Sequence, residues 1–135
     1  MLAGLLLPAL IAPALIMAAP AQEVQRRSTV YFGLDSVEVA PEAAPALDYI
    51  VRTMLAHPEM QARLSGHTDR TGTTEYNIAK SQRMAASVAR YLSDHGVLEA
   101  RITVIAYGEA KPAVPTRDDV REPMNRRVEI DLIGG

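Results

Sequence analysis

The chain has 135 residues, of which 48% are hydrophobic, and its formal net charge at pH 7 is −2. This length suits one domain with an additional segment, and the lack of excess positive charge argues against nucleic acid as a partner. The sequence contains no cysteine, which excludes disulfide bonds, a thiolate zinc site and a lipid-modified cysteine within it.

The N-terminal segment is apolar and carries no charged side chain before Glu23. It ends in Ala19-Pro20-Ala21, a small-x-small pattern that predicts a signal peptide cleaved after the last of these residues. Because no Lys or Arg precedes the apolar run, a retained N-terminal membrane anchor over residues 1–21 remains the alternative. In both cases the domain is expected outside the cytoplasm, after a short polar linker at residues 22–28.

The first part of the domain predicts a strand followed by a helix. Residues 29–32 alternate as a strand does, and the turn residues 33–36 end it. A helix is expected to start near Pro41, because proline suits a first helical turn, and to end at His57-Pro58. Its apolar stripe consists of Leu47, Ile50, Val51, Met54 and Leu55.

A second strand, a loop and a longer helix follow. Residues 62–65 alternate between apolar and polar, which predicts a strand, and residues 66–73 form a loop. The next helix is expected from residue 74 to about residue 95, with a threonine N-cap and Gly96 as a left-handed C-cap.

The C-terminal part predicts two more strands. Residues 102–107 form a strand that ends at Gly108, and residues 109–124 form a long surface connection with one helical turn. Residues 128–132 form an amphipathic last strand. The order β-α-β-α-β-loop-β predicts an α+β, two-layer sandwich of two main helices on a small mixed sheet, spanning residues 29–133.

Four motifs carry a resemblance to a known family. They are Val30-Tyr31-Phe32 with Asp35-Ser36, Gly66-His67-Thr68-Asp69 with Gly72 and Tyr76-Asn77, Tyr107-Gly108-Glu109 with Lys111-Pro112, and Asn125-Arg126-Arg127-Val128. In order and spacing they resemble the OmpA C-terminal-like family, which includes peptidoglycan-associated lipoproteins and the periplasmic part of MotB-type stator proteins. The resemblance implies a non-enzymatic domain with this fold that binds peptidoglycan non-covalently in the periplasm, near the outer membrane.

The resemblance also implies a ligand, the diaminopimelate side chain of the wall peptide, which ends in an ammonium and a carboxylate. Recognition of this zwitterion requires a fixed anion and a fixed cation. Asp69 occupies the position of the family's aspartate and would bind the ammonium. The residues that line the same pocket in the family correspond to Gly33, Leu34, Asp35, Thr68 and Asn77.

The sequence leaves the source of the cation open, because Met84 occupies the position of the family's arginine and Lys80 that of a leucine one turn earlier. Three interpretations remain. Lys80 supplies the charge from nearly the same helix face, Arg83 supplies it from the neighbouring position, or the usual ligand is lost and Met84 is a core residue. The last interpretation gives an alternative function: an envelope interaction or scaffold module with lost or altered ligand binding.

Other polar residues have simpler explanations. His67 has no partner at metal-ligand spacing, so we expect it to hold the loop through hydrogen bonds. A hydrolase triad of Ser81, His67 and Asp69 is not expected, because no nucleophile-elbow motif is present. No catalytic residue, metal or cofactor is therefore predicted. Asp118 and Asp119 are expected to form a solvated surface pair.

The arginines of the fourth motif alternate, so one is expected to face the pocket rim and the other to face water. Arg126 is a candidate for ligand contact or, equally, an arginine here pairs with a loop carboxylate while Asn125 braces the start of the strand. The expected partners are peptidoglycan and, as a second class, outer-membrane or other envelope proteins. The sequence leaves the oligomeric state open.

Overall fold

The computed structural model describes residues 24–135 together with Gly4, Pro8 and Pro13. The predicted signal peptide or anchor at residues 1–21 lies, apart from those three positions, outside the described residues, as does its cleavage site. None of the helices in the described part combines the length and apolar character that a bilayer span requires.

Residues 24–135 form four strands and two main helices in the predicted order. The strands are β1 Arg27–Tyr31, β2 Gln61–His67, β3 Ile102–Gly108 and β4 Arg127–Ile133. The main helices are α1 Ala44–Ala56 and α2 Thr74–Asp94, and single 3-10 turns lie at Pro41–Ala43, Glu99–Arg101 and Pro123–Asn125. The predicted α+β fold is confirmed, including the helical turn in the last connection.

The strands form one mixed sheet in the order β1-β4-β2-β3. β4 is antiparallel to both β1 and β2, whereas β2 and β3 are parallel and are joined by α2. Because β4 pairs with β2, His67 at the end of β2 lies opposite Arg127 at the start of β4. This pairing brings the second and fourth sequence motifs together.

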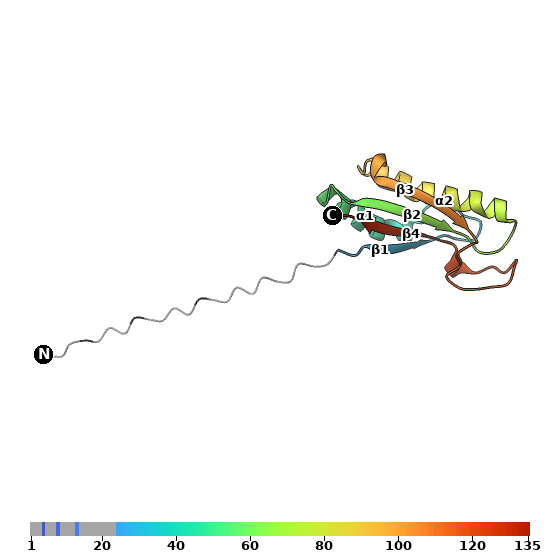
Figure 1. Cartoon of the computed structure of the whole chain (residues 1–135), viewed down its shortest axis with the longest axis horizontal. Coiled ribbons are helices and arrows are strands. Elements are labelled where there is room, and N and C mark those ends of the chain that lie inside the picture. The colour runs from blue at the N-terminus through green and yellow to red at the C-terminus, as the bar shows by residue number, and fades with distance from the viewer. Residues whose placement is uncertain (1–3, 5–7, 9–12, 14–23) are drawn as a thin grey trace.

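Both main helices lie on one side of the sheet, and the connection from β3 to β4 lies at the end of the sheet away from the C-terminus (Figure 1). The core between the two layers consists of Val30, Phe32, Leu47, Ile50, Val51, Met54, Met60, Ala62, Leu64, Met84, Ala85, Val88, Leu92, Val97, Val128, Ile130 and Leu132. The opposite face of the sheet is polar and includes Ser65, His67 and Glu129. We call it the open face.

The first strand begins earlier than predicted. Arg27 and Ser28, which the sequence places in the linker, pair with Asp131 and Ile130 of β4. The Arg27 Nε atom lies 2.8 Å from the Asp131 carboxylate, and this charge complementarity extends the edge pairing. The difference arises because a polar edge segment gains strand character only from its long-range partner.

Helix α2 approaches β2 closely at Gly66. A Cβ atom at this position would lie 2.2 Å from the Ser81 backbone oxygen of α2. The Ser81 hydroxyl also accepts a hydrogen bond of 3.0 Å from the Gly108 amide at the end of β3. These contacts fix the first turns of α2 against the ends of β2 and β3, where the candidate site lies.

Candidate ligand-binding site

The loop that follows β2 leads directly into α2. Gly72 has a φ of 87°, a left-handed conformation that glycine adopts at low cost. The Thr73 hydroxyl accepts a 3.1 Å hydrogen bond from the Tyr76 amide and caps the helix, as the sequence predicts. The loop is therefore held at both ends, which fixes the position of Asp69.

Asp69 is almost fully buried, with 1% of its surface exposed. One carboxylate oxygen accepts hydrogen bonds from the Thr71 hydroxyl at 2.6 Å and the Thr71 amide at 3.2 Å. The other accepts from Arg126 Nη1 at 3.1 Å and from the Glu122 amide at 3.3 Å. Burial alone would raise the pKa of Asp69, but these donors outweigh it and lower the pKa, so the carboxylate is ionised at neutral pH.

Arg126 joins three segments that are far apart in the sequence. Its backbone accepts a hydrogen bond from the Phe32 amide at 2.9 Å, and its Nε atom donates to the Phe32 carbonyl at 3.3 Å. The same side chain pairs with Asp69, and it is only 8% exposed. The turn at residues 33–35 and the loop around Asp69 are thus brought to one place by a residue from the fourth motif.

The expected structural role for the fourth motif is present. The Asn125 side chain bonds both the amide and the carbonyl of Val114, each at 2.8 Å, and braces the start of β4. An arginine pairs with a loop carboxylate, as one of the two interpretations expected. The expectation that the neighbouring arginine faces water is wrong, because Arg127 is 5% exposed and lies on the open face beside Glu129.

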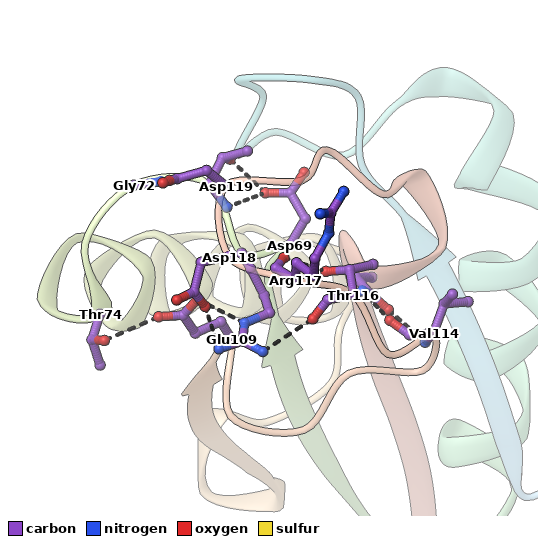
Figure 2. A network of polar contacts seen from close by, with 12 residues as sticks. Asp69, Gly72, Thr74, Glu109, Val114, Thr116, Arg117, Asp118 and Asp119 are labelled. Carbon is purple, nitrogen blue, oxygen red and sulfur yellow. Dashed lines mark hydrogen bonds and ion pairs between the residues drawn. The ribbon is translucent and has the colours of Figure 1, made fainter.

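The connection from β3 to β4 covers this site. Figure 2 shows Glu109, Asp118 and Asp119 of the connection gathered beside the loop that carries Asp69. Arg70 donates to the Thr116 carbonyl and pairs with Asp118, and the Gly72 amide lies 3.4 Å from the Asp119 carboxylate. Asp118 and Asp119 are both exposed, as predicted, and both also contact the loop, Asp118 through Arg70 and Asp119 through its amide, which donates to the Arg70 carbonyl.

Two predicted pocket residues have buried polar atoms that lack partners. Within residues 24–135, neither the Thr68 hydroxyl nor the Asn77 side-chain nitrogen has a hydrogen-bond partner. Both residues lie against Gly108. The Thr68 amide donates to the Gly108 carbonyl at 2.9 Å, and a Cβ atom at Gly108 would lie 3.2 Å from the Asn77 carbonyl carbon. Buried polar groups without partners are rare in folded proteins and point to a functional surface.

The two residues proposed as cation sources, and Met84 at the position of the family's arginine, occupy different environments. Lys80 is 5% exposed and forms no ion pair or side-chain hydrogen bond within the described part of the chain. Met84 is fully buried in the core, whereas Arg83 lies on the exposed surface of α2. Lys80 is therefore the less exposed of the two candidate cations.

His67 does not hold the loop as predicted, because neither ring nitrogen forms a hydrogen bond within residues 24–135. The ring stacks on Tyr107, with 5.1 Å between centroids, and its Nε2 atom lies 3.5 Å from the Glu129 carboxylate. The His67 ring lies on the open face of the sheet, whereas Ser81 packs on the helix side of β2 at Gly66. Ser81 and His67 are therefore not assembled into a triad.

The environment of His67 predicts a pH-dependent stability. Burial and then Arg127 lower its pKa from 6.5 to about 4, with Lys111 acting in the same direction and Glu129 opposing it. Because the pKa of His67 is lower in the folded than in the unfolded chain, the contribution of His67 to folding stability is complete above pH 6.5. This stability is lost as the pH falls toward 4. We expect a loss of about 2 kcal/mol over this range, after allowance for solvent screening. Urea unfolding at several pH values should show a flatter profile for His67→Phe, and an unchanged profile would contradict the assignment.

The sequence does not predict two of the groups that hold Asp69. Thr71 has a usable signal, because an aspartate followed two residues later by threonine is typical of a side-chain-capped turn. No sequence signal predicts the contact of the Glu122 backbone amide with Asp69, because the position of this amide depends on how the long connection folds over the loop.

Known proteins share this fold and part of this sequence. The model of the OmpA family matches residues 31–126, a range that contains every candidate ligand-binding residue. The chain belongs to the OmpA family. The matched range includes the paired residues Asp69 and Arg126 and the turn at residues 33–35.

Individual relatives of this OmpA-family chain extend the comparison. It is 42% identical over 103 residues to the peptidoglycan-associated lipoprotein of Pasteurella multocida, covering 76% of this chain and 69% of that protein. It is 34% identical over 112 residues to outer membrane porin F of Pseudomonas fluorescens, covering 83% of this chain and 34% of that protein. The crystal structure of the peptidoglycan-associated lipoprotein from Burkholderia pseudomallei superposes with a TM-score of 0.74 at 32% identity, covering 81% of this chain and 91% of that one.

Proposed function

We propose that this OmpA-family domain binds peptidoglycan non-covalently in the periplasm and so links the cell envelope to the wall. Relatives at up to 42% identity bear the name peptidoglycan-associated lipoprotein, and another is an outer membrane porin, which supports wall association and an envelope location. The proposal includes export by residues 1–21 with cleavage after Ala21. Sequencing the mature N-terminus of protein recovered from periplasm tests this part, and a retained first residue would contradict it.

The observation that carries the binding proposal is a group of buried polar side chains without partners beside Asp69. Within residues 24–135, the Thr68 hydroxyl and the Asn77 side-chain nitrogen are buried without a hydrogen-bond partner. Lys80 is 5% exposed as a whole residue and forms no ion pair within the same residues. An unpaired buried hydroxyl or amide is costly. A ligand that supplies a carboxylate and further acceptors would satisfy the two buried groups and pair with the lysine.

The geometry supports a zwitterion as that ligand, and we propose the diaminopimelate side chain of the stem peptide. Asp69 would bind its ammonium and Lys80 its carboxylate, with the backbone at Gly33, Leu34 and Asp35 lining the site. The ammonium would replace the Glu122 amide, whose 3.3 Å hydrogen bond is the longest of the four to Asp69. A charged donor would thereby take the place of a neutral one, which strengthens the contact.

Access to Asp69 requires a small movement of the connection between β3 and β4. The connection contributes the Glu122 amide that covers one carboxylate oxygen. It is tied to the loop by the Asp119 amide, which donates to the Arg70 carbonyl at 2.9 Å. Arg126 remains beside Asp69 and is proposed to orient the carboxylate, while the ligand enters from the side of the connection.

Binding to purified sacculi tests the role of Lys80. Lys80→Ala should lower the affinity about ten- to a hundredfold, because a charge-assisted contact contributes about 1.5–3 kcal/mol. Arg83→Ala is the matched control, since it removes a cation three positions further along the same helix but from the exposed surface. Equal losses in the two variants would show that only net charge matters and would contradict a specific role for Lys80.

Asp69→Asn tests the other end of the ligand. The variant keeps the shape of the side chain but removes the charge that attracts an ammonium, so sacculus binding should fall below detection. Circular dichroism must show that the variant is folded, because Asp69 also anchors the loop. A folded Asp69→Asn variant that binds sacculi as well as the unchanged domain would rule out this site.

Met84 supports the alternative function, a scaffold module that has lost or altered ligand binding. Its side chain is fully buried in the core at the position of the family's arginine. Under this alternative the unchanged domain would not bind sacculi, and only Met84→Arg, confirmed as folded, would do so. Binding by the unchanged domain that depends on Lys80 favours the first function.

A further inference from the structure

The open face of the sheet carries a second polar groove that the proposed wall-binding function does not use. The groove has a volume of about 500 Å³ and runs along the open face over β2 and β4, from Arg63 and Asp131 to His67 and Lys111. Its side chains include His67 from β2, Tyr107 from β3, Lys111 from the connection, and Arg127 and Glu129 from β4. Asp69 and the site described above lie at the loop end of β2 and are not part of this lining.

The groove is positively charged although the chain as a whole is not. Four cationic side chains line it against two carboxylates, whereas the formal net charge of the chain is −2. The carboxylates are already engaged, since Asp131 pairs with Arg27 at 2.8 Å and with Arg63 at 3.8 Å, and Glu129 pairs with Arg127 at 3.2 Å. Lys111 is the cation of this lining that has no carboxylate partner within residues 24–135.

His67 supplies an independent indication of a ligand. Its side chain is 3% exposed, it lines the groove, and neither ring nitrogen has a hydrogen-bond partner within residues 24–135. The nearest anionic atom, on Glu129, lies 3.5 Å away, and that carboxylate is shared with Arg127. A buried imidazole without partners is unfavourable, so two unpaired ring nitrogens beside a cationic groove favour a bound acceptor.

Lys111 is held in place without being neutralised. Its ammonium lies 4.4 Å from the centre of the Tyr107 ring, the same ring on which His67 stacks. A cation–π contact orients an ammonium but leaves its N–H donors free for an anion. Within the described part of the chain, Lys111 forms no ion pair.

We propose that this groove is a binding site for a tetrahedral oxyanion of the phosphate class, held by His67 and Lys111. Lys111 supplies the charge, and the imidazole supplies a donor at the buried end of the groove. Arg127 has each of its guanidinium nitrogens engaged by Glu129, Asn125 or Lys111 and holds the walls in position. The anion in question is a phosphate ester, carried by a free metabolite or by a lipid head group.

The state of His67 provides a direct measurement of binding. Burial of the ring and the positive charges of Arg127 and Lys111 lower the pKa of His67 to about 4, against the opposing effect of Glu129. An oxyanion beside the ring favours the imidazolium form, so binding raises this pKa toward 6.5. Each tenfold preference of the anion for the protonated form raises the pKa by about one.

The test follows the His67 ring proton by NMR in pH titrations at constant ionic strength, with sulfate or chloride as the anion. Sulfate keeps its charge throughout the range and stands in for the phosphate group. The expected result is a His67 pKa raised by about one or more in sulfate relative to chloride. Equal values in the two salts would overturn the proposal.

Variants separate this site from a general salt effect and from wall binding. Lys111→Ala should weaken sulfate binding about tenfold, whereas Arg117→Ala, which removes an exposed cation of the same connection outside the groove, should not. Asp69→Asn should lose sacculus binding and keep the sulfate response. Lys111→Ala should keep sacculus binding and show a weakened sulfate response. A sulfate response that survives Lys111→Ala unchanged would overturn the proposal, whatever the outcome of the sacculus assay.

Two further arms identify the source of the phosphate. Glycerol phosphate should reproduce the sulfate response if a free ester suffices. If the groove takes a lipid head group, sedimentation with vesicles containing phosphatidylglycerol should exceed that with phosphatidylcholine alone and should depend on Lys111. Failure of both glycerol phosphate and anionic vesicles would contradict the assignment to the phosphate class.

Discussion

Replacing Gly66 by alanine is expected to destabilise the domain by about 3 kcal/mol or more. The added Cβ would lie 2.2 Å from the Ser81 backbone oxygen and 2.9 Å from its carbonyl carbon. Both atoms belong to the backbone of α2, so a side-chain rotation cannot relieve the overlap. The helix must move away from β2, which also breaks the hydrogen bond between the Ser81 hydroxyl and the Gly108 amide.

Urea unfolding followed by circular dichroism measures this effect. Gly33→Ala is the matched control, because the nearest atom to its added Cβ is 3.8 Å away and its stability should change by about 0.5 kcal/mol or less. A Gly66→Ala variant within about 1 kcal/mol of the unchanged domain would show that α2 does not pack against β2 as described.

Replacing Arg126 by methionine is expected to cost about 3–5 kcal/mol at neutral pH. The change leaves the Asp69 carboxylate buried, with the Thr71 and Glu122 donors but without its cation. It also removes the hydrogen bond from Arg126 to the Phe32 carbonyl, which holds the turn at residues 33–35 near the loop. Sacculus binding should fall together with stability, because both sides of the site depend on this side chain.

The pH dependence of this loss has a definite sign. The pKa of Asp69 is lowered in the folded domain, so its stabilising contribution is complete above its ordinary value of 3.8 and is lost as the pH falls through the lowered value. Without Arg126 the pKa of Asp69 should rise. The stability of the variant should therefore differ least from that of the unchanged domain in acid, where Asp69 is protonated in both proteins. A difference that stays constant from pH 7 down to acid would contradict an electrostatic origin.

An exposed pair provides the control for this prediction. Arg27 and Asp131 lie 2.8 Å apart, but the Arg27 side chain is 73% exposed. Arg27→Met should therefore change stability far less than Arg126→Met, although it breaks a shorter contact. In a double-mutant cycle, Asp69 and Arg126 should show a coupling of about 1–3 kcal/mol, and independent effects would refute a buried ion pair.

Local patterns in the sequence were sufficient for the element order and most element ends. The stripe from Leu47 to Met54 and the cap at Thr73 act within one or two helical turns, so the sequence predicts them without knowledge of a distant partner. The same holds for the end of α2, where Gly96 has the expected left-handed conformation with a φ of 103°. Leu55 was wrongly included in the stripe, because this residue is 52% exposed. The start of β1 was misplaced because Arg27 is ordered by pairing with Asp131, a residue at the far end of the chain.

The candidate site shows the same division between local and long-range information. The motif around Asp69 identifies a carboxylate at a loop between a strand and a helix, since glycine and capping residues mark that loop. The identity of its cationic partner was left open, because Arg126 reaches Asp69 only through the antiparallel pairing of β2 with β4. The sequence also did not predict that the ring nitrogens of His67 lack hydrogen-bond partners within residues 24–135. A polar residue beside a loop usually forms such bonds, and whether it does depends on which distant side chains lie near it.

The amino-acid sequence by itself determined the two-layer fold and the loop that carries Asp69, because periodicity, capping and turn residues act over a few positions. Only the tertiary structure decided which arginine reaches Asp69, which polar atoms remain without partners, and that Arg127 and His67 face a separate groove. The reason is physical: burial and ion pairing depend on the distances between segments far apart in the chain, and sheet pairing and helix packing set those distances.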